Sequence, residues 1–253
     1  MAEKLFLVFD IETAGIEWDQ LAPSQQEYLL RGCETEAERE EQKQLMALSP
    51  LTAQIVCIGL ALYRYDQQRR EEGYEGNVEK EAVLLVDPQC SGEEQRRLQL
   101  EDGTPVIAAA EVQVLHLFWK ILERYAQAHL VTFNGRTFDA PFLMLRSAVL
   151  RVRPSVNLMA GTRWRYDRHT DLADELSFFG GGQTGPQRRY NFDFYAHAFG
   201  IPSPKGGEVH GYTVGEFFRQ GKLLPIAEYC LQDVRATWQL FLRWNRYLNF
   251  SLL

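Results

Sequence analysis

The sequence predicts an α/β fold in which a mixed sheet is flanked by helices. Predicted strands cluster in the first half of the chain, helix-period patterns fill the second half, and one predicted helix separates the third strand from the fourth. At 253 residues and 45% hydrophobic composition, the chain is long enough to bury a sizeable core. One domain over residues 1–253 is therefore favoured over two.

The first predicted strand, Lys4–Glu12, has the sequence KLFLVFDIE and is apolar almost throughout, as in a central strand covered on both faces. It ends in two acids, Asp10 and Glu12. Because strand side chains alternate with period two, both carboxylates point to the same side. Their repulsion and their loss of water favour a cation, and Mg²⁺ and Mn²⁺ accept such oxygen ligands. For a D-x-E pattern taken alone, the alternative is a strand that simply ends in solvent.

Residues 18–48 are polar and charged, and they predict a helical insertion. This insertion is either a solvated excursion or a flap over the site. Strands follow at residues 54–63 and 82–86, and the polar link between them predicts an antiparallel meander. Residues 87–106 are expected to form a loop with a polar helical piece.

The second half of the chain is predicted to be mainly helical. A helix at residues 108–126 leads into a fourth strand at 130–133. The remaining expected elements are a short strand at 169–172 and helices at 138–150, 192–199, 213–220 and 224–247. The predicted sheet therefore has five strands.

The charge and the cysteines exclude several classes of protein. A formal net charge of −7 argues against a protein that coats polyanions, but metal ions can still supply positive charge to a site that handles nucleic acid. The four cysteines have no C-x-x-C spacing, so we expect reduced thiols and neither a zinc site nor a disulfide framework. No signal-peptide pattern is seen, and no apolar run approaches the roughly 20 residues that span a bilayer. We therefore expect a cytoplasmic protein with no membrane partner.

Three more residues of interest come later in the chain. Asp139 begins the helix after the fourth strand, where α/β sheets place ligands, although an Asp there also suits a helix N-terminus. Tyr229 and Asp233 are four residues apart in the last predicted helix, so they share one face at the edge of its apolar stripe. Taken alone, Asp139 is equally well explained by its place at a helix N-terminus. The alternative for the other pair is an edge tyrosine and a surface aspartate.

Taken together and in order, these residues resemble the DEDD exonucleases. The resemblance rests on FDIET at residues 9–13, NGRTFDAPFL at 134–143 and YCLQDV at 229–234. Tyr229 indicates the tyrosine subgroup (DEDDy), since the histidine subgroup has its histidine where this chain has Glu228. RYDRHTDL at 165–172 and SPKGG at 203–207 resemble the stand-alone predicted 3′–5′ exonucleases related to the proofreading domain of family B DNA polymerases.

The resemblance implies a ribonuclease-H-like fold with a mixed five-stranded sheet, and a catalytic set of four acids and a tyrosine. Two divalent ions, Mg²⁺ or Mn²⁺, are implied, one held by Asp10, Glu12 and Asp233 and the other by Asp10 with Asp139. Lying about 3.5–4 Å apart, such ions stabilise the attacking and leaving oxygens of a phosphodiester. Because a phenol with a pKa of about 10 is a poor base at neutral pH, we expect Tyr229 to orient the attacking water.

The expected substrate-binding residues are Thr13, Asn134, Phe138 and Lys205. Lys205 can reach the scissile phosphate from a Gly-rich loop, and Phe138 can stack on a base, although core packing explains Phe138 equally well. Residues 163–168 interleave arginines with Trp and Tyr, which is typical of single-strand grooves but also of a strand edge with outward arginines. Asp171 is expected to support the structure near the site.

The sequence therefore predicts a metal-dependent 3′–5′ exonuclease that releases nucleoside 5′-monophosphates from single-stranded or frayed DNA ends. One alternative is an exoribonuclease on the same scaffold, and another is a non-catalytic nucleic-acid-binding or polymerase-associated module. The module would be favoured by the loss of an acid, and none is lost. A polymerase or repair partner, for proofreading or DNA repair, stays open.

Overall fold

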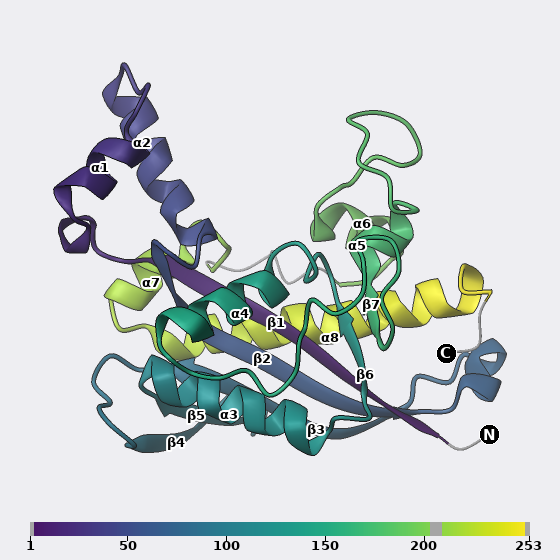
Figure 1. Cartoon of the computed structure of the whole chain (residues 1–253). Coiled ribbons are helices and arrows are strands. Elements are labelled where there is room, and N and C mark those ends of the chain that lie inside the picture. Colours follow the sequence, from purple (N-terminus) through teal and green to yellow (C-terminus); the bar gives the residue numbers. More distant parts are fainter. Residues whose placement is uncertain (1–2, 203–208, 251–253) are drawn as a thin grey trace.

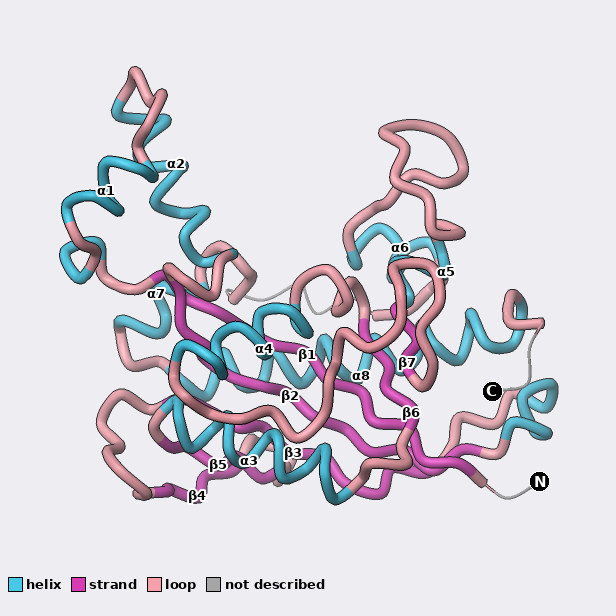
Figure 2. Tube along the Cα trace, viewed as in Figure 1, coloured by secondary structure: helices cyan, strands magenta, loops and turns pink. Residues whose placement is uncertain are grey.

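A seven-stranded mixed sheet forms the centre of the molecule (Figures 1 and 2). The computed structural model describes residues 3–202 and 209–250. The strands, in the spatial order β4-β5-β3-β2-β1-β6-β7, are β1 (Lys4–Gly15), β2 (Ala53–Tyr65), β3 (Asn77–Val86), β4 (Gln95–Gln99), β5 (Pro105–Ala109), β6 (His129–Thr132) and β7 (His169–Asp171). The α-helices are α1 (Pro23–Leu29), α2 (Glu36–Leu45), α3 (Glu111–Arg124), α4 (Asp139–Val149), α5 (Leu172–Leu176), α6 (Phe192–Ala198), α7 (Val214–Arg219) and α8 (Leu223–Tyr247). Short 3-10 helices in the described part of the chain are η1 (Trp18–Gln20), η2 (Met46–Leu48) and η3 (Gln67–Glu72).

Strand β1 lies inside the sheet and sets its directions. It pairs antiparallel with β2 and parallel with β6, and β6 in turn pairs parallel with β7. The carboxyl ends of β1, β6 and β7 therefore lie at the same edge of the sheet. In an α/β sheet this is the edge where ligands bind.

The side chains of β1 alternate between two packed faces. Phe9 packs against Phe118 of α3, with the ring centroids 5.7 Å apart. Phe6 packs against Phe241 of α8 at 5.2 Å, on the opposite face. Figure 1 shows α3 and α4 on one side of the sheet and α8 on the other. By the same alternation, Asp10 and Glu12 share the face of Phe6 and look toward α8.

The predicted fold class is confirmed, but the sheet has two more strands than predicted. The five predicted strands correspond to β3-β2-β1-β6-β7, with β1, β2 and β3 longer than expected and paired as the predicted meander. The extra strands, β4 and β5, fall mostly in the region expected to be a loop with a helical piece. Strand β4 (QRRLQ) is an exposed edge strand with one apolar residue, and β5 opens on a proline, so neither shows strand alternation.

The insertion between β1 and β2 is helical, as predicted, and forms an arm that projects from the body of the molecule (Figure 1). We use the name arm for residues 18–48. Its base is anchored by Met46, which is buried, and by Thr13, whose hydroxyl donates a hydrogen bond to the carbonyl oxygen of Ala47 at 2.7 Å. The arm is therefore attached directly to the strand that carries Asp10 and Glu12.

None of the helices in residues 3–202 and 209–250 is long and apolar enough to cross a membrane.

Candidate active site

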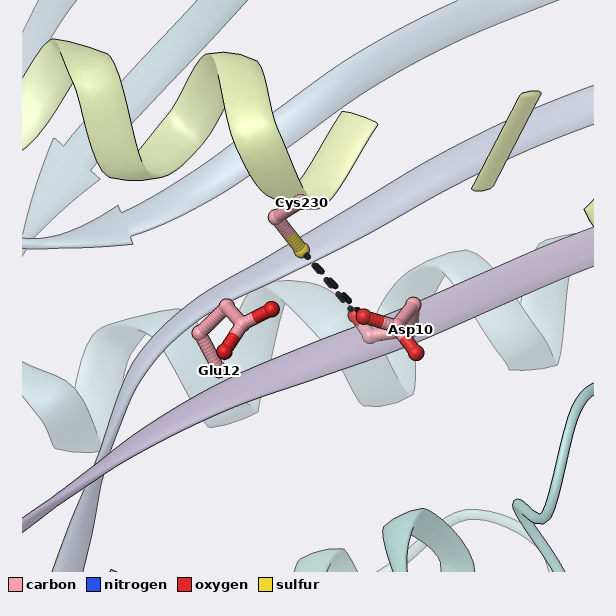
Figure 3. Close-up of side chains that lie close together, drawn as sticks. All are labelled: Asp10, Glu12 and Cys230. Atoms are coloured by element: carbon pink, nitrogen blue, oxygen red, sulfur yellow. Dashed lines mark hydrogen bonds between the residues drawn. The ribbon is translucent and has the colours of Figure 1, made fainter. Parts of the chain in front are cut away.

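Four carboxylates from three separate elements converge at the end of β1. Asp10 and Glu12 are half-buried, and their side chains lie on the same side of the strand, beneath α8 (Figure 3). Asp139, the first residue of α4, is 4% exposed and accepts a hydrogen bond from the backbone N–H of Ile11 at 3.0 Å. Asp233 approaches from α8, close enough to raise the pKa of Asp10 and of Glu12 electrostatically. The fold therefore brings these four acids together.

The electrostatics of the cluster are unfavourable without a counter-charge. Desolvation raises the pKa of Asp10 well above its usual range, and repulsion from Asp139, Asp233 and Glu12 raises it further. The pKa of Glu12 is raised in the same way, first by desolvation and then by Asp233 and Asp139. For Asp139, burial raises the pKa to about 7. Such shifts occur where like charges are gathered away from water, which is common at functional sites.

Helix α8 also brings Tyr229 to the cluster. The Tyr229 side chain is 8% exposed and forms a hydrogen bond with Asp233, one helical turn away. Burial, followed by the negative charges of Asp233 and Glu12, raises the pKa of Tyr229 far above its usual range. The phenol therefore keeps its proton at all physiological pH values and can act as a hydrogen-bond donor.

Two residues that the sequence analysis did not single out allow α8 to lie close to β1. Gly59 of β2 is the register partner of Asp10, and a Cβ atom there would lie 3.0 Å from both the Sγ atom of Cys230 and a methyl group of Val234. Cys230 donates a weak hydrogen bond to the carbonyl oxygen of Asp10 at 3.5 Å. Figure 3 marks hydrogen bonding between these two residues. A glycine inside an apolar strand is the signal that marks such a close approach.

The donor set fits a hard divalent cation. Oxygen atoms of Asp10 and Glu12 lie within 4.8 Å of each other and of the Cys230 sulfur atom. Burial and a hydrogen bond with Cys57 raise the pKa of the Cys230 thiol, so it remains protonated and is a poor ligand. What remains is a group of carboxylate oxygens, the ligands that Mg²⁺ and Mn²⁺ prefer.

The turn before α4 holds two of the expected substrate-binding residues. Asn134 has a left-handed backbone (φ 63°), and its N–H donates to Asp171 at 2.8 Å. Asp171 also accepts the N–H of Arg136 at 2.7 Å, so it supports the turn as expected. Phe138 is half-buried and packs against Phe142, with the ring centroids 5.6 Å apart.

The other two expected substrate-binding residues are placed differently. Thr13 follows an irregularity in the β1–β2 register. Its side chain is buried, and its hydroxyl donates a hydrogen bond to the carbonyl oxygen of Ala47 in the arm. Lys205 lies outside the described residues. Residues 163–168 form a loop, so the alternative of a strand edge with outward arginines is wrong.

Residues 89–249 match the model of a protein family described as predicted 3′–5′ exonucleases related to the exonuclease domain of PolB. The chain belongs to this family. The matched region contains Asp139, Tyr229 and Asp233. Asp10 and Glu12 precede this region in the sequence, and the fold brings them close to Asp139 and Asp233. Family membership makes the chain a predicted 3′–5′ exonuclease, a class of hydrolase that acts on phosphodiester bonds.

The whole fold of this exonuclease is similar to a solved structure of the family B DNA polymerase from the hyperthermophilic archaeon Pyrobaculum calidifontis. The match has 18% sequence identity and a TM-score of 0.55, and it covers 95% of this chain. It covers 24% of the polymerase chain, so the present chain spans about a quarter of that length. At this identity the similarity shows the fold alone, that of a ribonuclease-H-like polymerase exonuclease domain. No curated protein sequence matches the chain.

Proposed function

We propose that the chain is a metal-dependent 3′–5′ exonuclease that removes nucleoside 5′-monophosphates from single-stranded or frayed DNA ends. The observation that carries the proposal is the convergence of Asp10, Glu12, Asp139 and Asp233, where the negative charges of neighbouring acids raise the carboxyl pKa values. A gathering of this kind, with raised carboxyl pKa values, is stable in ionised form only with cations present. DNA is favoured over RNA because the family is related to a DNA polymerase exonuclease domain.

The metal ligands in this proposal are the four acids. Asp10, Glu12 and Asp233 would hold one ion, and Asp10 with Asp139 would hold a second. When bound, Mg²⁺ or Mn²⁺ ions supply Lewis-acid stabilisation of the negative charge that builds up during phosphodiester hydrolysis. Asp139 is suited to the role because one of its oxygens is fixed by the N–H of Ile11, which orients the carboxyl group.

Tyr229 is assigned the orientation of the attacking water. Its raised pKa excludes a role as a proton acceptor near neutral pH, while its hydrogen bond with Asp233 fixes the ring beside the acids. Asn134 and Phe138, one to five residues before Asp139, are proposed to contact the terminal nucleotide. Thr13 and Lys205 remain candidates for substrate binding.

The experiment that tests this function uses single strands of DNA and RNA labelled at the 5′ end, incubated with Mn²⁺, with Mg²⁺ or with EDTA. A ladder that shortens one nucleotide at a time, absent in EDTA and in Asp10→Asn, is the expected result. Stronger cleavage of RNA than of DNA would show that the protein is an exoribonuclease and not a DNA exonuclease. Binding without cleavage of either strand, in both metals, would replace it by a non-catalytic module.

A further inference from the structure

The loop at residues 160–168 presents an exposed tryptophan between arginines. Trp164 is 61% exposed, and the Arg163 guanidinium lies over its ring, 5.1 Å from the centroid. A compact turn holds them at the tip, because the backbone N–H and the hydroxyl of Thr162 both donate to the carbonyl oxygen of Arg165. The aromatic face is therefore displayed to solvent by a folded loop.

The exposed charge in this region is positive, although the chain as a whole is acidic. Residues 151–168 contain five arginines and one aspartate, a formal charge of +4. Within residues 3–202 and 209–250, the side chains of Arg163, Arg165 and Arg168 form no salt bridge. Two nearby acids are used internally, since Asp171 is buried against backbone N–H groups and Asp174 is buried against Arg189. The exposed Asp167 is already counted in the charge of +4.

A second exposed aromatic ring lies beside this loop in a strained backbone. Phe178 and Phe179 are consecutive and both left-handed, with φ 51° and φ 57°. Bulky residues rarely adopt this conformation, and strain of this kind tends to persist at functional positions. Phe178 is 62% exposed, while Phe179 packs against Trp164 with the ring centroids 6.3 Å apart.

This surface is attached to the turn that carries Asp139. The Arg136 guanidinium donates to the carbonyl oxygen of Leu158 at 2.8 Å and stacks on the ring of Tyr166 at 4.2 Å. From the next segment, Arg189 donates to the hydroxyl of Thr137 at 3.5 Å. Thr137 is two residues from Asp139, which places the two residues within about 7.6 Å of each other.

We propose that Arg163, Trp164, Arg165 and Phe178 form a binding surface for the single strand that leads to the active site. We call these four residues the strand-binding surface. Arginines neutralise phosphates, and exposed aromatic faces stack on bases without requiring a particular sequence, which is the combination that single strands need. This inference rests on the proposed function and adds to it a second contact region outside the carboxylate cluster.

The charge of the arm supports this choice of path. Residues 18–48 contain seven acidic and three basic residues, a formal charge of −4, and Figure 1 shows the arm and the α5–α6 region rising from opposite ends of the sheet. A polyanion near the site is therefore repelled from the arm and attracted to the strand-binding surface.

Trp164 supplies a direct test, because Trp119, Trp238 and Trp244 are buried and Trp18 is half-buried. Binding of oligothymidylate in EDTA, where no hydrolysis takes place, is expected to quench the tryptophan fluorescence of the wild type. The quenching should disappear in Trp164→Phe, and Trp164→Ala should lose about fivefold or more in affinity. An abasic oligonucleotide of equal length, which has the charge without the bases, should cause no quenching.

The charge contribution is tested with matched pairs of arginines. Arg163→Ala/Arg165→Ala should weaken binding and lower the slope of log affinity against log salt by about 1.4, since each phosphate contact to a single strand contributes roughly 0.7. The control, Arg97→Ala/Arg124→Ala, removes two exposed arginines, one of them on β4 at the sheet edge opposite β7, and should leave the slope unchanged. Equal losses in both pairs, or equal binding of the abasic strand, would overturn the proposal.

These assays separate this inference from the proposed function. Quenching of Trp164 fluorescence with no hydrolysis in Mn²⁺ would refute the proposed exonuclease activity and support the strand-binding surface. If the wild type hydrolyses DNA in Mn²⁺ but the Trp164 and arginine variants bind the strand as tightly as the wild type does, the strand-binding surface is refuted and the exonuclease activity is supported.

Discussion

The carboxyl group of Asp139 contributes both to the fold and to the proposed chemistry. One oxygen accepts the N–H of Ile11, in the strand segment between Asp10 and Glu12, and so fixes the start of α4 against β1. Burial raises its pKa from 3.8 to about 7, so ionisation of this carboxyl is unfavourable in the metal-free protein. Asp139 therefore stabilises the fold as a hydrogen-bond acceptor, whereas its negative charge destabilises the metal-free protein.

We predict that Asp139→Asn separates these two effects. The amide keeps an acceptor for the N–H of Ile11 but removes the charge. Hydrolysis should fall by more than about 100-fold, beyond the loss typical for outer partners of metal ligands. The melting temperature in EDTA at pH 8 should rise, by roughly 2–4 °C for each kcal/mol gained. A variant that loses stability in EDTA while keeping its activity would contradict the assignment.

The stability of the metal-free protein should depend on pH with a definite sign. A carboxyl whose pKa is raised in the folded state binds more protons folded than unfolded, so its contribution is favourable at low pH. For Asp139 that contribution is lost as the pH rises from about 4 to about 7. In thermal melts in EDTA, we expect the melting temperature of Asp139→Asn to exceed that of the wild type by an amount that grows between pH 5.5 and pH 8. A difference that is constant with pH would show that Asp139 is not protonated in the folded protein.

Tyr229→Phe tests the role of the phenol. Because the pKa of Tyr229 is raised far above its usual range, the rate of the wild type should show no loss or gain from tyrosine ionisation up to pH 10. Removing the hydroxyl should lower the turnover rate by about 100-fold, the lower end of the loss caused by removing one active-site hydrogen-bond donor, while Mn²⁺ affinity is kept. Unchanged turnover would exclude Tyr229 from the reaction.

At the scale of elements, the position of α4 depends on a buried ion pair. Glu111, the first residue of α3, accepts two hydrogen bonds from Arg146 of α4, each 2.8 Å long, and one from the N–H of Ile55 in β2. Both charged side chains are nearly buried, at 12% and 11% exposure. One carboxylate thus ties α3, α4 and the central sheet together.

We predict that Glu111→Ala destabilises the protein by about 3–5 kcal/mol, because it leaves the Arg146 charge buried without a counter-charge. The matched control is Glu72→Ala, which breaks the exposed pair of Arg69 and Glu72 and should cost about 0–1 kcal/mol. Urea unfolding of both variants measures the difference. Equal costs would mean that the buried pair does not hold α4 in place.

The elements also show which features of the fold can be predicted from the sequence. Strand β1 was predictable because its apolar run is continuous, and α8 because its apolar stripe has helical spacing. Strand β4 was not, since its five residues include one apolar side chain and its stability comes from pairing with β5. Pairing between strands is a non-local property that periodicity does not record.

At the scale of the whole molecule, the site forms where segments more than 120 residues apart in sequence meet. The ordered set of motifs predicted which acids would meet, but not what allows them to approach. The absence of a side chain at Gly59 and the hydrogen bond from Cys230 to Asp10 depend on the register of β1 with β2 and on the packing of α8. Neither the register nor the packing is recorded in the spacing of the motifs.

The measurement that tests the central claim most directly is a count of bound Mn²⁺ by electron paramagnetic resonance. We expect the wild type to bind Mn²⁺ at pH 8, up to two ions per chain, and Asp233→Asn to lose most of this binding. Glu228→Gln, which removes a partly exposed acid from the same helix outside the cluster, should bind as the wild type does. No Mn²⁺ bound by the wild type, or equal binding by the two variants, would contradict the claim that these four acids form a metal centre.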